Sequence, residues 1–200
     1  MTSEVAIANR ALQLLGADSI ISLSEDNNRA RTLRIAYEPV RDAEQHRRRW
    51  RFCIKRAQLA ALSAAPDFGY SYQYQLPNDY LRLIEGGDIA SAVDLSDYRS
   101  QSSAAYSVEG DRVLTNYGAP LSIRYLARIT DTSKFNASFV EALSARLAYE
   151  CCERITQSNE KRNLAERQYK DALKEARQAN ALEVASESIA DDAWIIARMQ

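Results

Sequence analysis

The spacing of apolar residues divides the chain into two helical stretches on either side of a β-rich stretch. Over residues 1–65, and again from residue 135 to about residue 180, apolar residues recur every three or four positions, which is typical of amphipathic helices. Between them, several short segments alternate apolar and polar residues, which is typical of half-buried strands. The pattern predicts a mainly α fold: an antiparallel helical bundle with an inserted small antiparallel β region and an extended C-terminal arm.

The first half of the bundle is predicted to contain three helical pieces. The first ends at Gly16, a residue that suits a helix C-terminus. The second begins near Ser24, and Pro39 should kink or divide it because proline donates no backbone hydrogen bond. A third helical piece is expected over residues 53–62.

The middle of the chain, residues 66–130, is expected to form the β insert. Gly110 and Asp111 form a turn signal between two alternating segments. Strands are expected within the segments 71–77, 81–87, 105–110, 111–117 and 121–129.

The last part of the chain is expected to complete the bundle and to add an arm. Residues 131–180 should supply two long helices, the second of which begins at residues 158–160. Residues 181–200 should form the arm. We expect the arm to dock on a partner, because chain ends are usually polar and this one is apolar; the alternative is that it folds back on its own bundle. The partner-binding residues are then Trp194, Ile195, Ile196 and Met199.

The composition gives no global attraction to nucleic acid or to a membrane. The chain has 200 residues, 26 basic and 27 acidic, with a net charge of −1. Its first ten residues lack the pattern of a secretory signal, and its longest nearly apolar run, residues 59–65, is too short for a membrane span. The three cysteines are an odd number and two are adjacent, which favours free buried thiols in a reducing compartment.

No pattern that carries enzymatic chemistry stands out. His46 is the single histidine, and it lies in a run of arginines where a solvated helix face is the expected place for it. Cys151 and Cys152 are adjacent, so they lack the two-residue spacing of a CxxC metal site. The six glycines form no phosphate-binding loop. We therefore expect no catalytic residue, no metal site and no cofactor, and a protein that is not an enzyme.

The most distinctive stretch is the run HRRRWRFCIKR at residues 46–56, called here the basic cluster. Trp50 and Phe52 are expected to turn inward as structural anchors. The cations either pair with acids on another copy of the chain or contact phosphate; equal totals of both charges favour pairing between copies. The cations of the cluster are Arg47, Arg48, Arg49, Arg51, Lys55 and Arg56.

Several motifs in a fixed order resemble the head-to-tail adaptor family of tailed phages, which includes tail tubular protein A. They are the run YEPVRD at 37–42, WRF at 50–52 followed by KRAQLA at 55–60, FGYSY at 68–72 and LPNDYLR at 76–82. The resemblance covers roughly residues 5–180. Residues 46–49 are more charged than is usual in such proteins.

The resemblance implies a structural virion protein at the head-tail junction, assembled in the host cytoplasm. Its members form a closed ring of about twelve copies, a dodecamer, through head-to-tail contacts between subunits. The implied partners are a portal protein, a tail nozzle or tail tube protein, and genomic DNA that passes through the lumen without sequence-specific recognition. The alternative is a helical nucleic-acid-binding module that uses the basic cluster.

Overall fold

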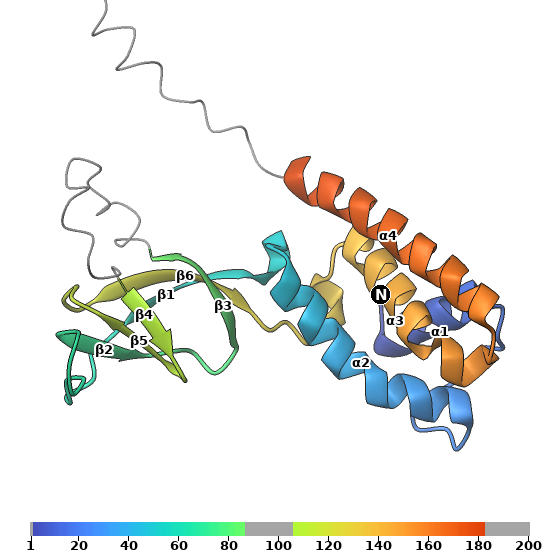
Figure 1. The fold of residues 1–200 in the computed structure, drawn as a ribbon, viewed down its shortest axis with the longest axis horizontal. Coiled ribbons are helices and arrows are strands. Elements are labelled where there is room, and N and C mark those ends of the chain that lie inside the picture. The colour runs from blue at the N-terminus through green and yellow to red at the C-terminus, as the bar shows by residue number, and fades with distance from the viewer. Residues whose placement is uncertain (1, 87–105, 183–200) are drawn as a thin grey trace, which may run out of the picture.

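Helices and strands occupy opposite ends of the molecule (Figure 1). The computed structural model describes residues 2–86 and 106–182. These residues are 51% helical and 19% strand, and they form four α-helices and two three-stranded antiparallel sheets. The predicted fold class, a mainly α bundle with a small β insert, is therefore wrong, because the fold is mixed α and β with two sheets.

The first two helices begin and end at residues suited to these positions. Helix α1 spans Glu4–Leu15, with a cap at Ser3, whose hydroxyl accepts from a backbone N–H. Gly16 ends it with a φ of 64°, a left-handed conformation that favours glycine. Helix α2 spans Asn28–Arg47 as one element. Pro39 lies inside α2 and does not divide it, so the division expected there as one of two outcomes is wrong.

The last two helices follow the predicted pattern closely. Helix α3 spans Ala137–Thr156 and helix α4 spans Asn159–Leu182. Helix α3 packs against α1, α2 and α4, so it is the central helix of this end of the molecule. The stripe of small and aromatic residues on α4, including Ala165, Tyr169 and Ala176, is buried against its neighbours.

The strands form two separate sheets. The first has the order β1-β6-β3, and the second has the order β2-β5-β4. Two short 3₁₀ segments, Arg51–Cys53 and Thr132–Lys134, lie where the chain passes between helices and sheets. The strands are β1 (Ile54–Leu59), β2 (Tyr72–Gln75), β3 (Tyr80–Gly86), β4 (Tyr106–Glu109), β5 (Arg112–Thr115) and β6 (Leu121–Ala127).

The expected third helical piece over residues 53–62 is wrong, because most of that segment is strand β1. Its residues pair with β6 in antiparallel register, with Ala57 opposite Ile123 and Leu59 opposite Leu121. Whether a segment forms a strand depends more on packing against neighbouring strands than on its local preference. Pairing with the edge of β6 therefore makes residues 54–59 a strand. The strands expected around 72–75, 80–86, 106–109, 112–115 and 121–127 are confirmed.

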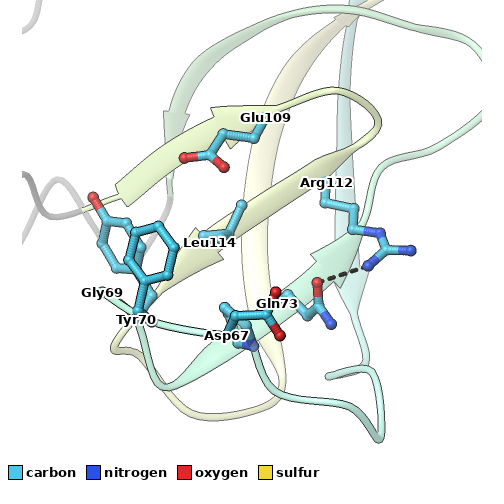
Figure 2. A pocket seen from close by; sticks show the side chains of 9 residues that line it. Asp67, Gly69, Tyr70, Gln73, Glu109, Arg112 and Leu114 are labelled. Atoms are coloured by element: carbon cyan, nitrogen blue, oxygen red, sulfur yellow. Dashed lines mark hydrogen bonds between the residues drawn. The ribbon is translucent and has the colours of Figure 1, made fainter.

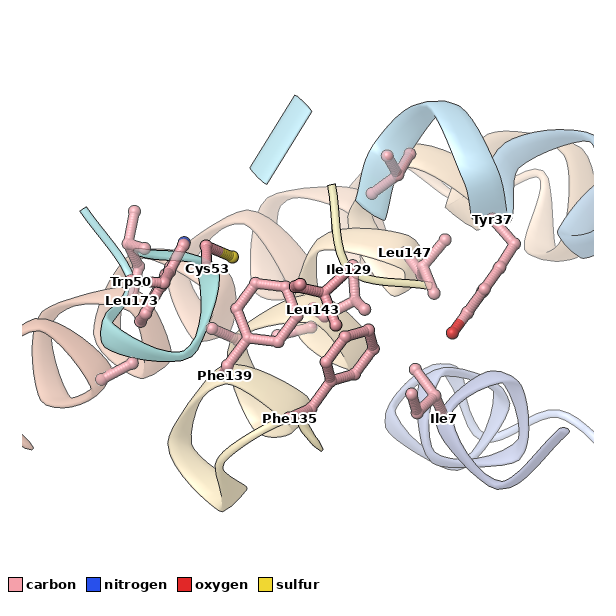
Figure 3. Packing of buried hydrophobic residues seen from close by; sticks show 14 of the residues in the cluster. Ile7, Tyr37, Trp50, Cys53, Ile129, Phe135, Phe139, Leu143, Leu147 and Leu173 are labelled. Carbon is pink, nitrogen blue, oxygen red and sulfur yellow. The ribbon is translucent and has the colours of Figure 1, made fainter. Parts of the chain in front are cut away.

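A single cluster of buried side chains joins the two ends of the molecule. Figure 3 shows its helical part, where Phe139 and Leu143 of α3 lie among side chains from other elements. The same cluster continues to Tyr74 and Leu121 in the sheets. The helical and β parts therefore share one core, which fixes their relative position. Among the described residues, no helix is both long and apolar enough to span a membrane.

Candidate functional site

The basic cluster lies at a corner of the chain and not on one helix. Arg47 ends α2, and Arg48 follows it in an extended conformation. Arg51 opens a 3₁₀ turn, and the last two cations, Lys55 and Arg56, lie on β1. The chain thus passes from helix to sheet within the cluster, and its cations point from three different elements.

The two aromatic residues of the cluster hold this corner in place. Trp50 is 1% exposed, and its indole N–H donates to the carbonyl oxygen of Glu44 at 2.9 Å. Its ring meets Phe139 edge-on, with ring centres 5.0 Å apart. Phe52 is half-buried and packs against Phe139 and Phe135 at 4.9 and 5.4 Å. A buried aromatic residue with a bonded polar group is a strong anchor, because it adds apolar burial without leaving a donor unpaired.

The cations of the cluster do not share one environment. Arg47 donates to the hydroxyl oxygen of Tyr169 on α4 at 3.0 Å. Lys55 pairs with Asp79 at 2.6 Å. The Nε atom of Arg48 is buried without a partner within the described structure. All the cations of the cluster except the half-buried Arg48 are exposed, and Arg49, Arg51 and Arg56 are the exposed arginines beyond Arg47.

A buried charge network lies directly behind the cluster. Glu44 is fully buried, and its Oε2 accepts from Arg146 at 2.6 Å and from the Tyr169 hydroxyl at 2.9 Å. Burial lowers the pKa of Arg146, but the bond to Glu44 outweighs it and the pKa is raised. Burial, and then the Glu44 carboxylate, raise the pKa of Tyr169 to about 12. These three residues bind α2, α3 and α4 together beneath the corner.

A second polar contact joins α2 to the end of β6. The Gln45 side chain donates to the carbonyl oxygen of Ile129 at 2.8 Å and accepts from its N–H at 2.9 Å. Asp42 of α2 pairs with Arg128 at 3.0 Å. Because Gln45 satisfies both backbone groups of Ile129, it replaces a strand neighbour at this position.

Asp79 joins the strands of the first sheet on the other side of the corner. Its carboxylate accepts from Lys55 of β1 at 2.6 Å and from the Tyr125 hydroxyl of β6 at 2.9 Å. Burial alone would raise the pKa of Asp79, but these two bonds lower it. The backbone N–H of Arg128 donates to the Asp79 carbonyl oxygen at 2.6 Å.

A hollow of about 180 Å³, called here the arginine hollow, lies beside the basic cluster. Its charged part consists of Arg49, Arg51 and Arg124, and its apolar part consists of Ile54 and Ile84. The end of α4 closes one side with Asn180 and Ala181.

Asn180 attaches α4 to the rim of this hollow. Its Oδ1 accepts from the N–H of Arg51, and its Nδ2 donates to the carbonyl oxygen of Arg49, each at 3.0 Å. Arg124 and Asn180 were not among the site residues predicted from the sequence. The alternation in β6 could have indicated that Arg124 faces away from Ile123 and Tyr125, but its pairing with Arg56 across β1 depends on the register.

A larger hollow, of about 330 Å³, lies at the far end of the β part (Figure 2). The loop that contains Phe68 and Tyr70 lies against one face of the second sheet, where Arg112 donates to Gln73 at 2.8 Å. Phe68 is 86% exposed. Phe68 and Tyr70 belong to the FGYSY motif at 68–72.

The residues considered for chemistry do not come together in the described structure. His46 is exposed near the end of α2. Cys53, Cys151 and Cys152 are buried free thiols, and burial raises the pKa of Cys53 and of Cys151 to about 12. Within residues 2–86 and 106–182, no group of three or more histidine, cysteine or acidic side chains could hold a metal ion.

The expected partner-binding residues of the arm, Trp194, Ile195, Ile196 and Met199, lie outside the described residues. The sequence also has acidic stretches at 94–97 and 191–192 that could pair with the basic cluster of another copy, and they lie outside the described residues as well. No protein-family model and no curated protein matches the chain. The resemblance to phage adaptors therefore rests on the motifs of the chain itself.

Proposed function

We propose that this chain is a structural virion protein, a ring-forming head-to-tail adaptor that joins a portal to a tail and lets DNA pass through its lumen. The proposal assigns it no catalytic residue, metal or cofactor. Its partners are the portal, a tail nozzle or tail tube protein, and further copies of the chain in a closed ring of about twelve.

The observation that carries the proposal is the convergence of two adaptor-like motifs at one residue. Asp42, from the motif at 37–42, pairs with the side chain of Arg128. Asp79, from the motif at 76–82, accepts a hydrogen bond from the backbone N–H of the same arginine. The motifs are far apart in the sequence, and together they join the helical part to the sheets. A common structural role at the junction supports a shared fold with the adaptors that the motifs resemble.

The surface of the corner is consistent with a contact between copies. Each copy presents exposed arginines at Arg49, Arg51 and Arg56, while the net charge of the whole chain is −1. Exposed arginines can contact acids on another surface, and a ring of head-to-tail contacts brings two different surfaces of neighbouring copies together. The proposal places the exposed arginines at or beside that contact.

Electron microscopy of the purified chain, alone and mixed with the portal and tail proteins of the same virus, tests the proposal. We expect closed rings that bind to the portal on one face. The proposal would be contradicted if the chain stays monomeric in every mixture, at protein concentrations well above the dissociation constant of a typical protein complex.

The nucleic-acid-binding module is the second candidate, because Arg56 and Arg124 lie directly opposite each other on β1 and β6. Two neighbouring arginines of this kind concentrate positive charge, which phosphate groups can contact. The cluster is not helical, however, and Arg47 and Lys55 have partners within the chain. Duplex DNA binding that weakens about a thousandfold between roughly 50 and 200 mM salt would favour this candidate over the adaptor.

A further inference from the structure

We infer that the loop around Phe68 of one copy of this chain docks between α2 and α3 of a second copy. A hollow of about 300 Å³, called here the α2–α3 groove, lies between these helices. Ile35 lines it and is 62% exposed, so apolar surface there stays in contact with water. Covering such a surface with an apolar group is favourable. The apolar lining consists of Ile35, Ala36, Pro39 and Val40 of α2 and Cys151 of α3.

The loop before β2 presents a side chain suited to this groove. Phe68 is 86% exposed, although phenylalanine is among the residues most often buried. Gly69, directly after it, has a φ of 86°, a conformation that favours glycine, so the bend of the loop beside Phe68 is set by the sequence. An aromatic side chain presented in this way is typical of the anchors that fill a pocket at an interface.

The charges beside the two apolar surfaces are complementary. Asp67 is exposed directly before Phe68, and Arg154 is exposed at the rim of the α2–α3 groove. In the part of the chain that the structure describes, neither side chain forms an ion pair. Glu150, the acid at the rim, lies 3.8 Å from Arg146, which offsets its charge. When Phe68 enters the groove, Asp67 can therefore pair with Arg154, and this pair orients the loop.

The groove also offers a backbone acceptor to the docked loop. Pro39 lies inside α2 and has no N–H, so it cannot donate to the carbonyl oxygen of Ile35 one turn earlier. Both residues line the groove. A backbone N–H of the loop can donate to this oxygen once the apolar contact has formed.

The loop that enters the groove must come from a second copy. The loop borders the second sheet and the groove lies between two helices, and sheets and helices occupy opposite ends of the molecule (Figure 1). One buried cluster joins these ends and fixes their relative position, so the loop does not reach the groove of its own chain. Every copy carries both surfaces, and a head-to-tail contact of this kind either repeats into an open chain or closes into a ring.

This contact deepens the proposed function, and only its closure into a ring rests on that proposal. Helix α2 carries the groove and leads into the basic cluster, so one contact between copies can include both surfaces. The two proposals fail separately. Copies that associate through loop and groove without closing would contradict the ring alone. Rings that form unchanged without the Phe68 side chain would contradict the loop contact alone.

Sedimentation of the purified full-length chain over a range of concentrations tests the contact. We expect the wild-type chain to self-associate. Phe68→Ala and Ile35→Glu should each raise the dissociation constant by about tenfold or more, because each removes one half of the anchor contact. A mixture of these two variants should associate into pairs that grow no further, because one intact loop and one intact groove remain in each pair.

The proposed ion pair gives a second test. Asp67→Arg and Arg154→Asp should each weaken association, because each places like charges together at the contact. Combining both changes in one chain should restore association at least in part. A combined variant that associates no better than either single variant would contradict the pairing of these residues.

Ile21→Ala and Leu164→Glu are the matched controls for Phe68→Ala and Ile35→Glu. Both control residues are exposed and apolar, and neither lines the groove. These variants should leave association unchanged. The inference is overturned if the wild-type chain stays monomeric at every concentration, or if Phe68→Ala and Ile35→Glu act no more strongly than their controls. It is also overturned if the mixture of the two variants associates no better than either variant alone.

Discussion

At the scale of single residues, the corner between helices and sheets depends on buried side chains that each satisfy more than one requirement. Trp50 fills the core and donates to the backbone of Glu44. Glu44 in turn accepts from Arg146 and from Tyr169. Because such groups are buried, removing one leaves either a cavity or an unpaired polar group, and both are costly.

Trp50→Ala should lower the free energy of unfolding by about 3–5 kcal/mol, because it empties a fully buried site between helices. Urea titration followed by circular dichroism measures the loss. His46→Ala, an exposed position four residues earlier, should change the free energy of unfolding by less than about 0.5 kcal/mol. An unchanged unfolding midpoint for Trp50→Ala would show that the anchor role is wrong.

Glu44→Gln should lower the free energy of unfolding by about 3–5 kcal/mol, because it removes the buried carboxylate that pairs with Arg146 and leaves this half-buried charge with only Glu150, at 3.8 Å. Glu141→Gln provides the control. Glu141 pairs with Arg10 at 3.2 Å, but both side chains are well exposed, so the loss should stay below about 1 kcal/mol. Equal losses in the two variants, measured by urea titration, would contradict the role given to the buried network.

At the scale of elements, the fold depends on contacts that bring distant segments together. Strand β1 forms because the edge of β6 is available to it. The Gln45 side chain of α2 occupies the place of a strand beside Ile129. Helix α4 is held at one end by Asn180 and near its middle by Tyr169. Its docking should therefore respond to the ionisation of Tyr169.

The pH dependence of stability should report this docking. Burial and Glu44 raise the pKa of Tyr169 from 10.0 to about 12, so the folded state keeps the phenol neutral where the unfolded state ionises it. The resulting stability is fully present below pH 10 and is lost between pH 10 and about pH 12. Tyr169→Phe should make this loss less steep, as measured by urea midpoints across the range. Some slope should remain from Tyr125, whose pKa burial and Asp79 also raise to about 12. An identical pH profile in both proteins would contradict the assignment.

At the scale of the whole molecule, one shared core joins two ends of different architecture. The helical end and the β end are connected by the corner that carries the basic cluster. Exposed arginines gather there, while the chain as a whole is close to neutral. This uneven distribution favours contacts with another surface over a general attraction to anions.

Reversing Arg49, Arg51 and Arg56 to glutamate should leave the monomer folded, because all three side chains are exposed. If the proposed ring depends on this surface, assembly should be impaired, as measured by sedimentation and electron microscopy. Arg34→Glu controls for a change of charge elsewhere. Normal rings combined with a loss of DNA binding would instead assign the surface to phosphate contacts.

The sequence by itself determined the periodic elements and several of their ends. Helices α1, α3 and α4 and most of the strands follow directly from apolar spacing, because one face of each must be buried whatever its neighbour is. The inward place of Trp50 could be expected too, because a large aromatic residue among cations has few other uses. These features depend on local spacing and side-chain character, which the sequence states directly.

Tertiary structure alone decided the rest. Residues 54–59 have a helical pattern of their own, and only the edge of β6 makes them a strand. The separation of the strands into two sheets, and hence the mixed fold class, depends on which strands pair. The buried network of Glu44, Arg146 and Tyr169 and the arginine hollow unite residues more than 50 positions apart. Such contacts follow from register and packing, which spacing along one chain does not specify.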